Sequence, residues 1–277
     1  MAKDDPNRQP PSLEVGRLSY WELSKRPLQI LTFLLPLIIL YEIGLALLLR
    51  SESGIMTNKA HESLLRFFDA FGINLGGGLF LGGLAIVVVL LIWHLLTREA
   101  WKIDLNTAAL MALESIVLIL PLLVIGQMIR QVTEMTMMAD VSGHWLLLTP
   151  QTGPGTNELA HLGLWSGVAI SVGAGLYEEL LFRMMFIAAV HTLLVDVCKV
   201  SNRTGMAIAL VLSSIAFALY HPLRDASGQF VMQKLVFYFL AGLYFGAIYL
   251  ARGFGIVVAV HAFYDILTIT VMNDQTG

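Results

Sequence analysis

Long apolar stretches separated by short polar segments dominate the pattern of this chain. The stretches cover residues 28–49, 76–96, 106–128, 162–195, 205–221, 233–251 and 254–272. Each approaches or exceeds the roughly 20 residues that a helix needs to cross a bilayer. The pattern therefore predicts an all-α fold, a polytopic transmembrane helical bundle of about seven membrane helices.

Three polar segments complete the pattern. Residues 1–27 contain several prolines and mixed charges, which predicts a polar tail. Residues 51–75 mix apolar and charged positions as an interfacial helix does, and would make an eighth helix if they dip into the membrane. Residues 129–160 predict a loop, because 149–156 are rich in proline and glycine. Such a loop could be a lid or a plain connection.

These segments suggest a division of the chain into two parts. Residues 1–27 form the tail and residues 28–277 the membrane domain. Within the membrane domain, 28–128 hold the first three spans. Residues 160–272 hold the polar motifs described below and form the expected catalytic core.

The composition supports the membrane assignment. Hydrophobic residues make up 57% of the 277 residues and charged residues 13%, whereas soluble domains average about 45–50% and 25%. The lipid bilayer is therefore the expected partner. No basic cluster indicates nucleic-acid binding. Cys198 is the single cysteine, which excludes an internal disulfide; we expect a packing residue or a thiol at a helix end.

The distribution of lysine and arginine indicates an orientation. With the tail inside, ten of these residues fall in inner segments and six in outer ones, and Arg183 lies within a span. An excess of positive charge marks the cytoplasmic side. We expect a multi-pass protein of the cytoplasmic membrane of a prokaryote, with a cytoplasmic N-terminus.

Ionisable residues within the fourth apolar stretch mark the first candidate site, because charges at membrane depth are costly and usually functional. Glu179 and Arg183 are four residues apart, which places them on one helix face where they can neutralise each other. Glu178 lies about 100° around the helix and can face a different partner.

Two further motifs follow on later helices. Phe217 and His221 have the spacing of one helix face, and so do His261 and Asp265. Each motif alone could be structural, since a membrane histidine often makes a hydrogen bond between helices. Together they supply the acid, base and hydrogen-bond donors that hydrolysis requires.

Two more carboxylates lie in the earlier apolar stretches. For Glu42 we favour a structural role, because no second polar group flanks it. Glu114 could be structural or could line the site.

The ordered motifs EExxxR, FxxxH and HxxxN/D on successive membrane helices resemble the CPBP family of intramembrane proteases (Abi, type II CAAX prenyl endopeptidase-like), which includes the Rce1 proteases. The resemblance covers residues 160–272. It implies an intramembrane endopeptidase whose substrate is a membrane-associated peptide or protein, with no cofactor.

The resemblance also implies a role for each motif residue. Glu178 would activate a water molecule as general base, and His221 would help to hold that water. His261 and Asp265 would stabilise the oxyanion. Supporting or substrate-positioning roles would fall to Glu179, Arg183 and Phe217.

Asp265 departs from the eukaryotic Rce1 proteases, which have asparagine at this position. An ionised aspartate cannot donate a hydrogen bond to an oxyanion. Asp265 must therefore be protonated, or it orients His261 and leaves that ring as the donor.

Zinc chemistry is the alternative for the same residues. Glu178, His221, His261 and Asp265 are all acceptable zinc ligands, but the chain lacks the HExxH spacing of one common zinc site. Together with the family resemblance, which implies a glutamate-dependent mechanism without metal, this favours that mechanism over zinc.

Two other classes of function stay open. One is a proton-coupled membrane transporter with buried carboxylates as a relay, which the lack of a repeat between the halves of the chain disfavours. The other is a non-catalytic membrane adaptor. The complete set of Glu178, His221 and His261 argues against the adaptor, because an inactive relative would be expected to have lost one of them.

The helix lengths leave one geometric question. His221 lies about 27 Å along its helix from the turn near residue 203, and His261 about 12 Å from the turn at residue 253. If both turns face the same side, the fourth and fifth helices must project beyond the bilayer there, or the seventh must lie deeper.

Overall fold

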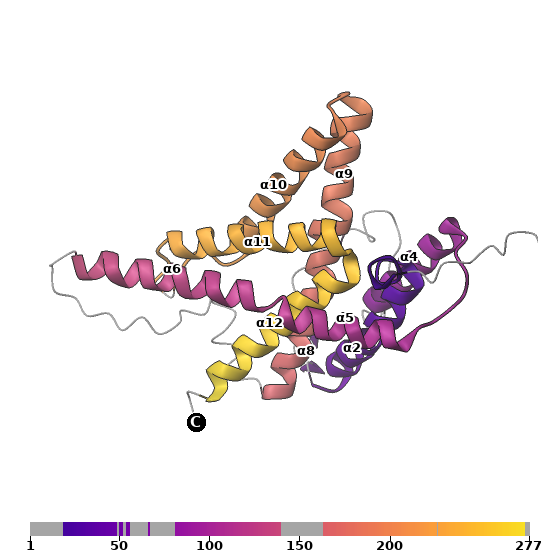
Figure 1. Cartoon of the computed structure of the whole chain (residues 1–277). Helices are drawn as coiled ribbons and strands as arrows, with labels where there is room; N and C mark the ends of the chain where they lie inside the picture. The colour runs from indigo at the N-terminus through magenta and orange to yellow at the C-terminus, as the bar shows by residue number, and fades with distance from the viewer. Residues whose placement is uncertain are drawn as a thin grey trace, which may run out of the picture.

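The computed structural model describes residues 19–48, 50–51, 54–55, 66, 81–139, 163–225 and 227–274. Nearly all of these residues are helical (Figure 1). The first half of the chain contains α1 (Tyr20–Leu23), α2 (Pro27–Leu47), the two-residue strands β1 (Arg50–Ser51) and β2 (Gly54–Ile55), α4 (Leu81–Thr97), α5 (Leu105–Val117) and α6 (Leu120–Ala139). The second half contains α8 (Leu164–Glu179), the π-helix η1 (Leu180–Phe186), α9 (Ile187–Thr192), the π-helix η2 (Leu193–Val197), α10 (Asn202–Tyr220), α11 (Met232–Arg252) and α12 (Phe254–Asp274).

The apolar helices confirm the all-α membrane fold. Five helical stretches are long and apolar enough to span a bilayer, namely Pro27–Leu47, Leu105–Val132, Leu164–Val197, Asn202–Tyr220 and Met232–Arg252. Two shorter apolar helices, Gly83–Thr97 and Phe254–Thr270, account for the other two predicted spans. Large apolar side chains on the outside, such as those of Ile43 and Leu113, form the surface that a helical membrane protein presents to lipid.

The segment after the third predicted span corrects one expectation. Residues 129–160 were expected to form a loop, yet α6 continues to Ala139. Residues 129–139 contain no glycine or proline, and most of them favour helix. Pro121 lies in the first turn of α6, where proline is tolerated, so the helical path breaks before it and not after it. Residues 140–160 and most of 51–75, including the predicted interfacial helix, lie outside the described residues.

The core forms where α12 packs against α8 and α2. Buried apolar residues run almost without interruption along the first part of α12, from Phe254 to Ala262. Gly175 of α8 allows this contact, because a Cβ atom there would lie 2.7 Å from the backbone oxygen of Val258 and 2.9 Å from the Cβ of Ala262. The close approach brings the end of α8 against the middle of α12.

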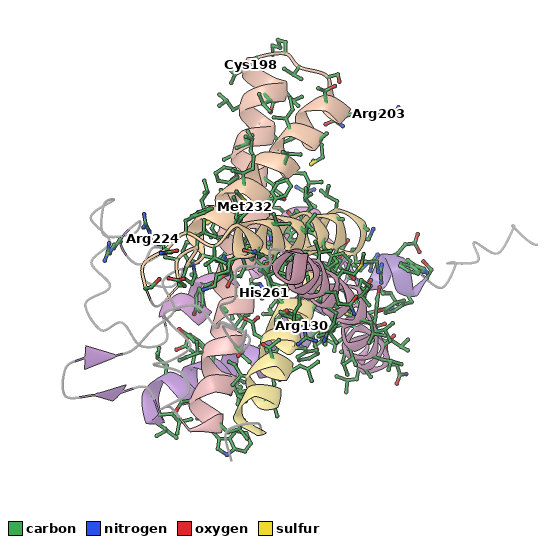
Figure 2. All side chains as sticks on the ribbon, turned by 90° about the vertical axis from the view of Figure 1, so that its left-hand side faces the viewer. Arg130, Cys198, Arg203, Arg224, Met232 and His261 are labelled. Carbon is green, nitrogen blue, oxygen red and sulfur yellow. The ribbon has the colours of Figure 1, made fainter. Side chains whose placement is uncertain are left out.

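The hairpin of α9 and α10 extends beyond the other helices (Figure 1). Its first arm belongs to a continuous helix of 34 residues, Leu164–Val197, which is about 51 Å long against roughly 30 Å of bilayer hydrocarbon. Cys198 lies exposed at the tip of the hairpin, far from His261 at the centre (Figure 2). Thus the fourth and fifth predicted helices project beyond the other helices. His221 and His261 can therefore lie at the same depth.

A polar cluster connects the early helices to the second half of the chain. Glu114 of α5 binds Arg252 at the end of α11, with 2.5 Å to Nε and 2.8 Å to Nη2. The Tyr20 hydroxyl donates to Glu114, and the Arg252 guanidinium lies 3.7 Å from the ring centroid of Trp21. Burial, and then the bond to Glu114, raise the pKa of Tyr20 to about 12. Glu114 therefore holds α1, α5 and α11 together.

Candidate active site

Glu179 and Arg183 form a fully buried ion pair at the junction of α8 and η1. Arg183 Nε lies 3.0 Å from Glu179 Oε2, and both side chains are 0% exposed. Arg183 Nη1 also donates to Ser213 Oγ of α10 at 3.4 Å, and its guanidinium lies 4.5 Å from the ring centroid of Phe217. The pair therefore connects α8 to α10. The π-helical turn after Glu179 is of a kind often found at functional sites.

Glu178 faces a different direction, as the spacing along a helix requires. Its Oε2 lies 3.5 Å from His221 Nε2 and 4.0 Å from His261 Nε2. Only 5% of the residue is exposed. One carboxylate oxygen thus lies between two imidazoles that come from different parts of the chain.

His221 lies at the end of α10, one residue beyond the last helical position. Pro222 follows it and keeps His221 in an extended conformation, with φ −78° and ψ 156°. The ring nitrogen Nδ1 lies 2.8 Å from the carbonyl oxygen of Phe217. Because a carbonyl only accepts, we assign the proton to Nδ1, which leaves the lone pair of neutral His221 on Nε2, toward Glu178.

His261 lies in the buried part of α12 and contacts three carboxylates. Its Nδ1 lies 2.8 Å from Glu179 Oε1, and its Nε2 lies 3.5 Å from Asp265 Oδ2 and 4.0 Å from Glu178 Oε2. Since Glu179 is paired with Arg183, it acts as an acceptor and places a proton on Nδ1. The Asp265 side chain is 30% exposed and lies at the outer edge of the cluster.

Aromatic side chains hold both imidazoles in place. The ring of Tyr238 in α11 stacks on His221 with centroids 4.1 Å apart. Phe245, two turns further along α11, stacks on His261 at 4.7 Å. Phe217 contacts both histidines edge-on or tilted, at 4.4 Å from His221 and 5.9 Å from His261. The positions of the two rings are thus set by neighbours on α10 and α11.

Tyr238, Phe245 and Ser213 belong to none of the three sequence motifs. The seven-residue spacing of Tyr238 and Phe245 places them on one face of α11. This spacing is the one sequence feature that could have indicated their role. It is weak, because the same helix carries several other aromatic residues. Ser213 gave no signal, since serine is common in apolar membrane helices.

All seven residues singled out from the motifs therefore meet in one cluster, and the two earlier carboxylates do not join it by any contact described here. Glu42 of α2 accepts a hydrogen bond from the backbone N–H of Gly83 in α4 at 2.9 Å. Glu114 binds Arg252, as described above. Both carboxylates connect helices.

A metal site requires several ligand side chains that converge on one point. Within the described ranges, no group of three or more His, Cys, Asp or Glu side chains is arranged to hold a metal ion. The absence of a cofactor remains a prediction, and chelation tests it directly.

The family model described as Type II CAAX prenyl endopeptidase Rce1-like matches residues 160–267. This part of the chain is thus similar to the Rce1-like family. The Rce1-like segment runs from just before α8 to the middle of α12 and contains every residue of the buried cluster. No curated protein and no solved structure shows significant similarity to the chain.

The Rce1-like match and the apolar helices support, in general terms, an intramembrane protease of the CAAX protease type. They confirm the family suggested by the three motifs. The first three predicted spans lie outside the matched residues, so the division into N-terminal spans and catalytic core stays a prediction.

Proposed function

We propose that the protein is an intramembrane endopeptidase that hydrolyses a peptide bond in a membrane-associated protein or peptide, with Glu178 as the general base. One observation carries the proposal. Glu178 of α8 meets His221 of α10 and His261 of α12 within 4.0 Å. A carboxylate placed between two imidazoles can take a proton from water and return it to a leaving group.

The water attacks from the side of Glu178 and His221. The 3.5 Å between Glu178 Oε2 and His221 Nε2 is long for a direct hydrogen bond, and both atoms can accept from a water held between them. Glu178 takes one proton as the water oxygen bonds to the carbonyl carbon. The same proton then passes to the departing amine as the carbon–nitrogen bond breaks, so that atoms and charge balance.

His261 supplies the donor to the oxyanion. Its Nδ1 proton is directed to Glu179, so Nε2 donates when the ring is an imidazolium. Asp265, at 3.5 Å from Nε2, then orients the ring and accepts from it in the absence of substrate. In this division of roles His261 donates the hydrogen bond to the oxyanion, which an ionised aspartate cannot do.

Replacing Glu178 with Gln tests the base. The amide has nearly the same shape but cannot take a proton, so we expect cleavage to fall by about 10²–10⁴-fold, as removal of a general base does. The measurement is cleavage of membrane peptides by the purified protein in lipid nanodiscs. A comparison of the membrane proteomes of wild-type and Glu178→Gln cells would identify substrates.

Glu22→Gln is the matched control, because Glu22 lies exposed on α1. Thermal unfolding and gel filtration check that both variants are folded. Wild-type rates in a folded Glu178→Gln protein would contradict the proposal.

Chelation separates the glutamate mechanism from zinc chemistry. We expect cleavage to persist after treatment with a strong chelator, and metal analysis to find less than one zinc per protein. Loss of activity on chelation that zinc restores would instead assign the cluster to a metal.

A further inference from the structure

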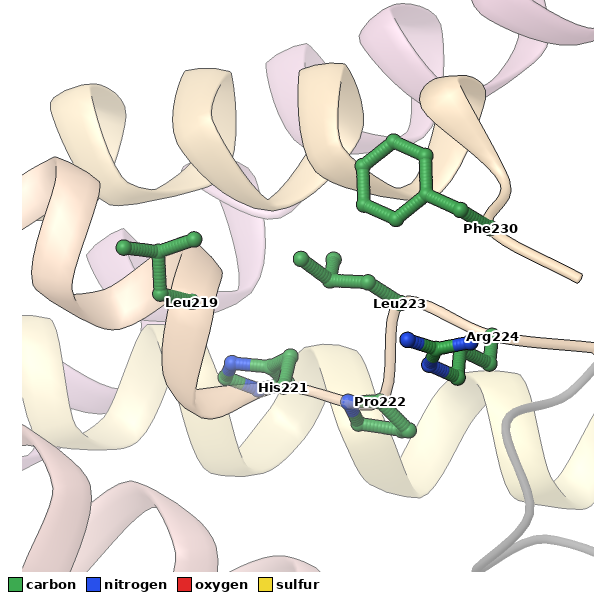
Figure 3. A pocket seen from close by; sticks show the side chains of 6 residues that line it. All are labelled: Leu219, His221, Pro222, Leu223, Arg224 and Phe230. Atoms are coloured by element: carbon green, nitrogen blue, oxygen red, sulfur yellow. The ribbon is translucent and has the colours of Figure 1, made fainter. Parts of the chain in front are cut away.

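The contacts of Glu178 leave its carboxylate room to move. Oε2 lies 3.5 Å from His221 Nε2 and 4.0 Å from His261 Nε2, both beyond the roughly 3.2 Å of a good hydrogen bond. The His221 side of the site is also not close-packed, because a cavity of about 430 Å³ lies beside this imidazole, between the end of α10 and the connection to α11 (Figure 3). The position of Glu178 therefore depends on how the backbone of α8 is held.

The α-helical geometry of α8 ends at Glu179, where the π-helix η1 begins. π-helical turns are rare and interrupt the regular i to i−4 hydrogen bonds, so side chains on both sides of α8 contribute to holding the chain here. Arg183 and His261 hold Glu179 on one side. Tyr177 lies about 200° from Glu179 around the helix, on nearly the opposite face. Its contacts provide the second point of attachment.

Tyr177 packs against α2. The residue is 1% exposed, and its ring centroid lies 5.2 Å from that of Tyr41. Gly173 lies one turn before Tyr177 on the same face of α8, and a Cβ atom there would overlap the Tyr41 ring. A Cβ atom at Gly44 of α2 would likewise overlap that of Ala169. These glycines let α2 approach α8 closely, as small residues do between membrane helices.

Glu42 follows Tyr41 and supplies a carboxylate to the same contact. It interacts with the Tyr177 hydroxyl and accepts a hydrogen bond from the backbone N–H of Gly83 at 2.9 Å. Only 6% of Glu42 is exposed. A buried hydroxyl is costly to leave without an acceptor, so this carboxylate fixes the direction of the Tyr177 side chain. One carboxylate of α2 thus joins α4 and the end of α8.

We propose that Glu42 is a positioning residue for the proposed hydrolysis. Through Tyr177 it fixes the end of α8 and thereby directs Glu178 toward the two histidines. Glu42 lies outside residues 160–267, which match the family model, so α2 contributes to the site from beyond the matched segment. The inference rests on the proposed endopeptidase activity and adds a residue that acts on its general base.

A purely structural role for Glu42 predicts a different behaviour. If the carboxylate only holds α2, α4 and α8 together, its loss lowers stability and leaves the turnover of the folded protein unchanged. If it positions Glu178, the folded protein loses kcat, because a displacement of about 1 Å at a catalytic group costs up to about 10²-fold in rate. KM should change little, because the displacement affects the reacting carboxylate and not the substrate.

Tyr177→Phe is the decisive variant, because it removes the hydroxyl and keeps the ring that packs on Tyr41. The assay follows the full-length protein in lipid nanodiscs with a synthetic membrane peptide that the wild type cleaves in a Glu178-dependent manner. We expect kcat to fall about tenfold, within the range for a misplaced catalytic group, with KM unchanged. Thermal unfolding of every variant separates this loss from a loss of folded protein.

Glu42→Gln is the conservative rescue. Its amide oxygen still accepts from the Tyr177 hydroxyl and the Gly83 N–H, so we expect kcat close to that of the wild type. Glu42→Leu removes the acceptor and should lower kcat as Tyr177→Phe does. The double variant Glu42→Leu with Tyr177→Phe should be no slower than Glu42→Leu alone, because both changes remove the same interaction.

Tyr244→Phe is the matched control. The Tyr244 hydroxyl donates to the carbonyl oxygen of Leu118 at 2.8 Å and so connects α11 to the end of α5. This variant also loses one tyrosine hydroxyl between helices, but not one on α8. We expect a lower unfolding temperature with kcat unchanged. If Tyr244→Phe lowers kcat as much as Tyr177→Phe, the effect is one of general stability and the proposal is wrong.

Failure of the positioning role and failure of the proposed function are distinguishable. If cleavage depends on Glu178 but Tyr177→Phe keeps the wild-type kcat, Glu42 does not position the base and the proposed function stands. Additive losses in the double variant, or a Glu42→Gln protein as slow as Glu42→Leu, would reject the role in the same way. If no peptide is cleaved in a Glu178-dependent manner, the proposed function itself fails. Should Glu42→Leu not fold, Tyr177→Phe, Glu42→Gln and the control decide the outcome without it.

Discussion

Arg183 has the largest fully buried side chain among the described residues, and its surroundings explain how a charge persists there. Glu179 neutralises it, Ser213 accepts from it, and the face of Phe217 lies beneath it. Burying an ion pair is costly, but leaving one partner alone costs more. The pair therefore sets the relative position of α8 and α10 at the point where Glu178 and His221 meet.

Replacing Arg183 with Met tests this coupling. The change leaves Glu179 as a buried carboxylate without its counter-charge, and we expect a loss of about 3–5 kcal/mol of stability. Thermal or denaturant unfolding in detergent measures it. The double variant Arg183→Met with Glu179→Gln should recover part of the stability, because no unpaired charge is buried and the Gln amide oxygen still accepts from His261. Cleavage should stay low. Equal stability of the single and double variants would contradict the coupling.

At this scale the sequence predicted the charged members of the cluster and not their aromatic neighbours. Glu178, His221 and His261 are conspicuous because ionisable groups are rare in apolar helices. Tyr238 and Phe245 are ordinary residues of a membrane helix, and their stacking on the imidazoles depends on how α11 lies against α10 and α12. No local pattern carries that information.

At the scale of helices, the contact between α8 and α12 positions the cluster. Gly175 lies one turn before Glu179 and faces the backbone of α12. Small residues at such crossings allow close approach in membrane proteins. The distance between Glu179 and His261, 2.8 Å, depends on that approach.

Gly175→Ala should therefore impair both stability and activity. The added Cβ would lie 2.7 Å from a backbone oxygen that cannot turn aside, so the helices must separate, at a cost of about 1–3 kcal/mol. We expect a lower unfolding temperature in detergent and a reduced kcat. Gly163→Ala is the matched control, since at this N-cap of α8 no described residue other than its immediate chain neighbours and the backbone of its own helix comes within 4 Å of the Cβ position. Equal effects of the two substitutions would contradict this role of Gly175.

Helix boundaries were predictable where proline, glycine or polar residues mark them. α10 ends before Pro222, and Gly253, with φ 88°, separates α11 from α12. The π-helical turns η1 and η2 were not predictable, because they preserve the apolar pattern of an α-helix. The extension of α6 to Ala139 lay outside the prediction, because proline and glycine mark only residues 149–156 and not 129–139.

At the scale of the molecule, the second half of the chain brings the buried cluster together and the first half packs around it. The Glu114–Arg252 contact and the packing of α2 on α8 join the two halves. The count of spans was predictable from hydropathy. The level at which the histidines meet was not, because it depends on how far the α9–α10 hairpin projects and on the contacts of α12.

The projecting hairpin also gives a way to determine orientation. Cys198 is the only cysteine of the chain and lies exposed at the tip. If the tail is cytoplasmic, the tip is expected to be cytoplasmic too, because four predicted spans lie between them. A membrane-impermeant maleimide should then label Cys198 in inverted vesicles and not in intact cells. Labelling of intact cells would reverse the assigned orientation, and Cys198→Ser controls for background.

The Cys198 thiol also allows a single spectroscopic probe to be attached to the native chain. A fluorophore or spin label on Cys198 would sit at the end of a helix continuous with the one that carries Glu178, with no other sulfhydryl to compete. If that helix tilts during turnover, its tip moves further than the residues near the cluster, because displacement grows with distance along the helix. Conformational change during proteolysis could thus be followed in real time without altering any residue of the buried cluster.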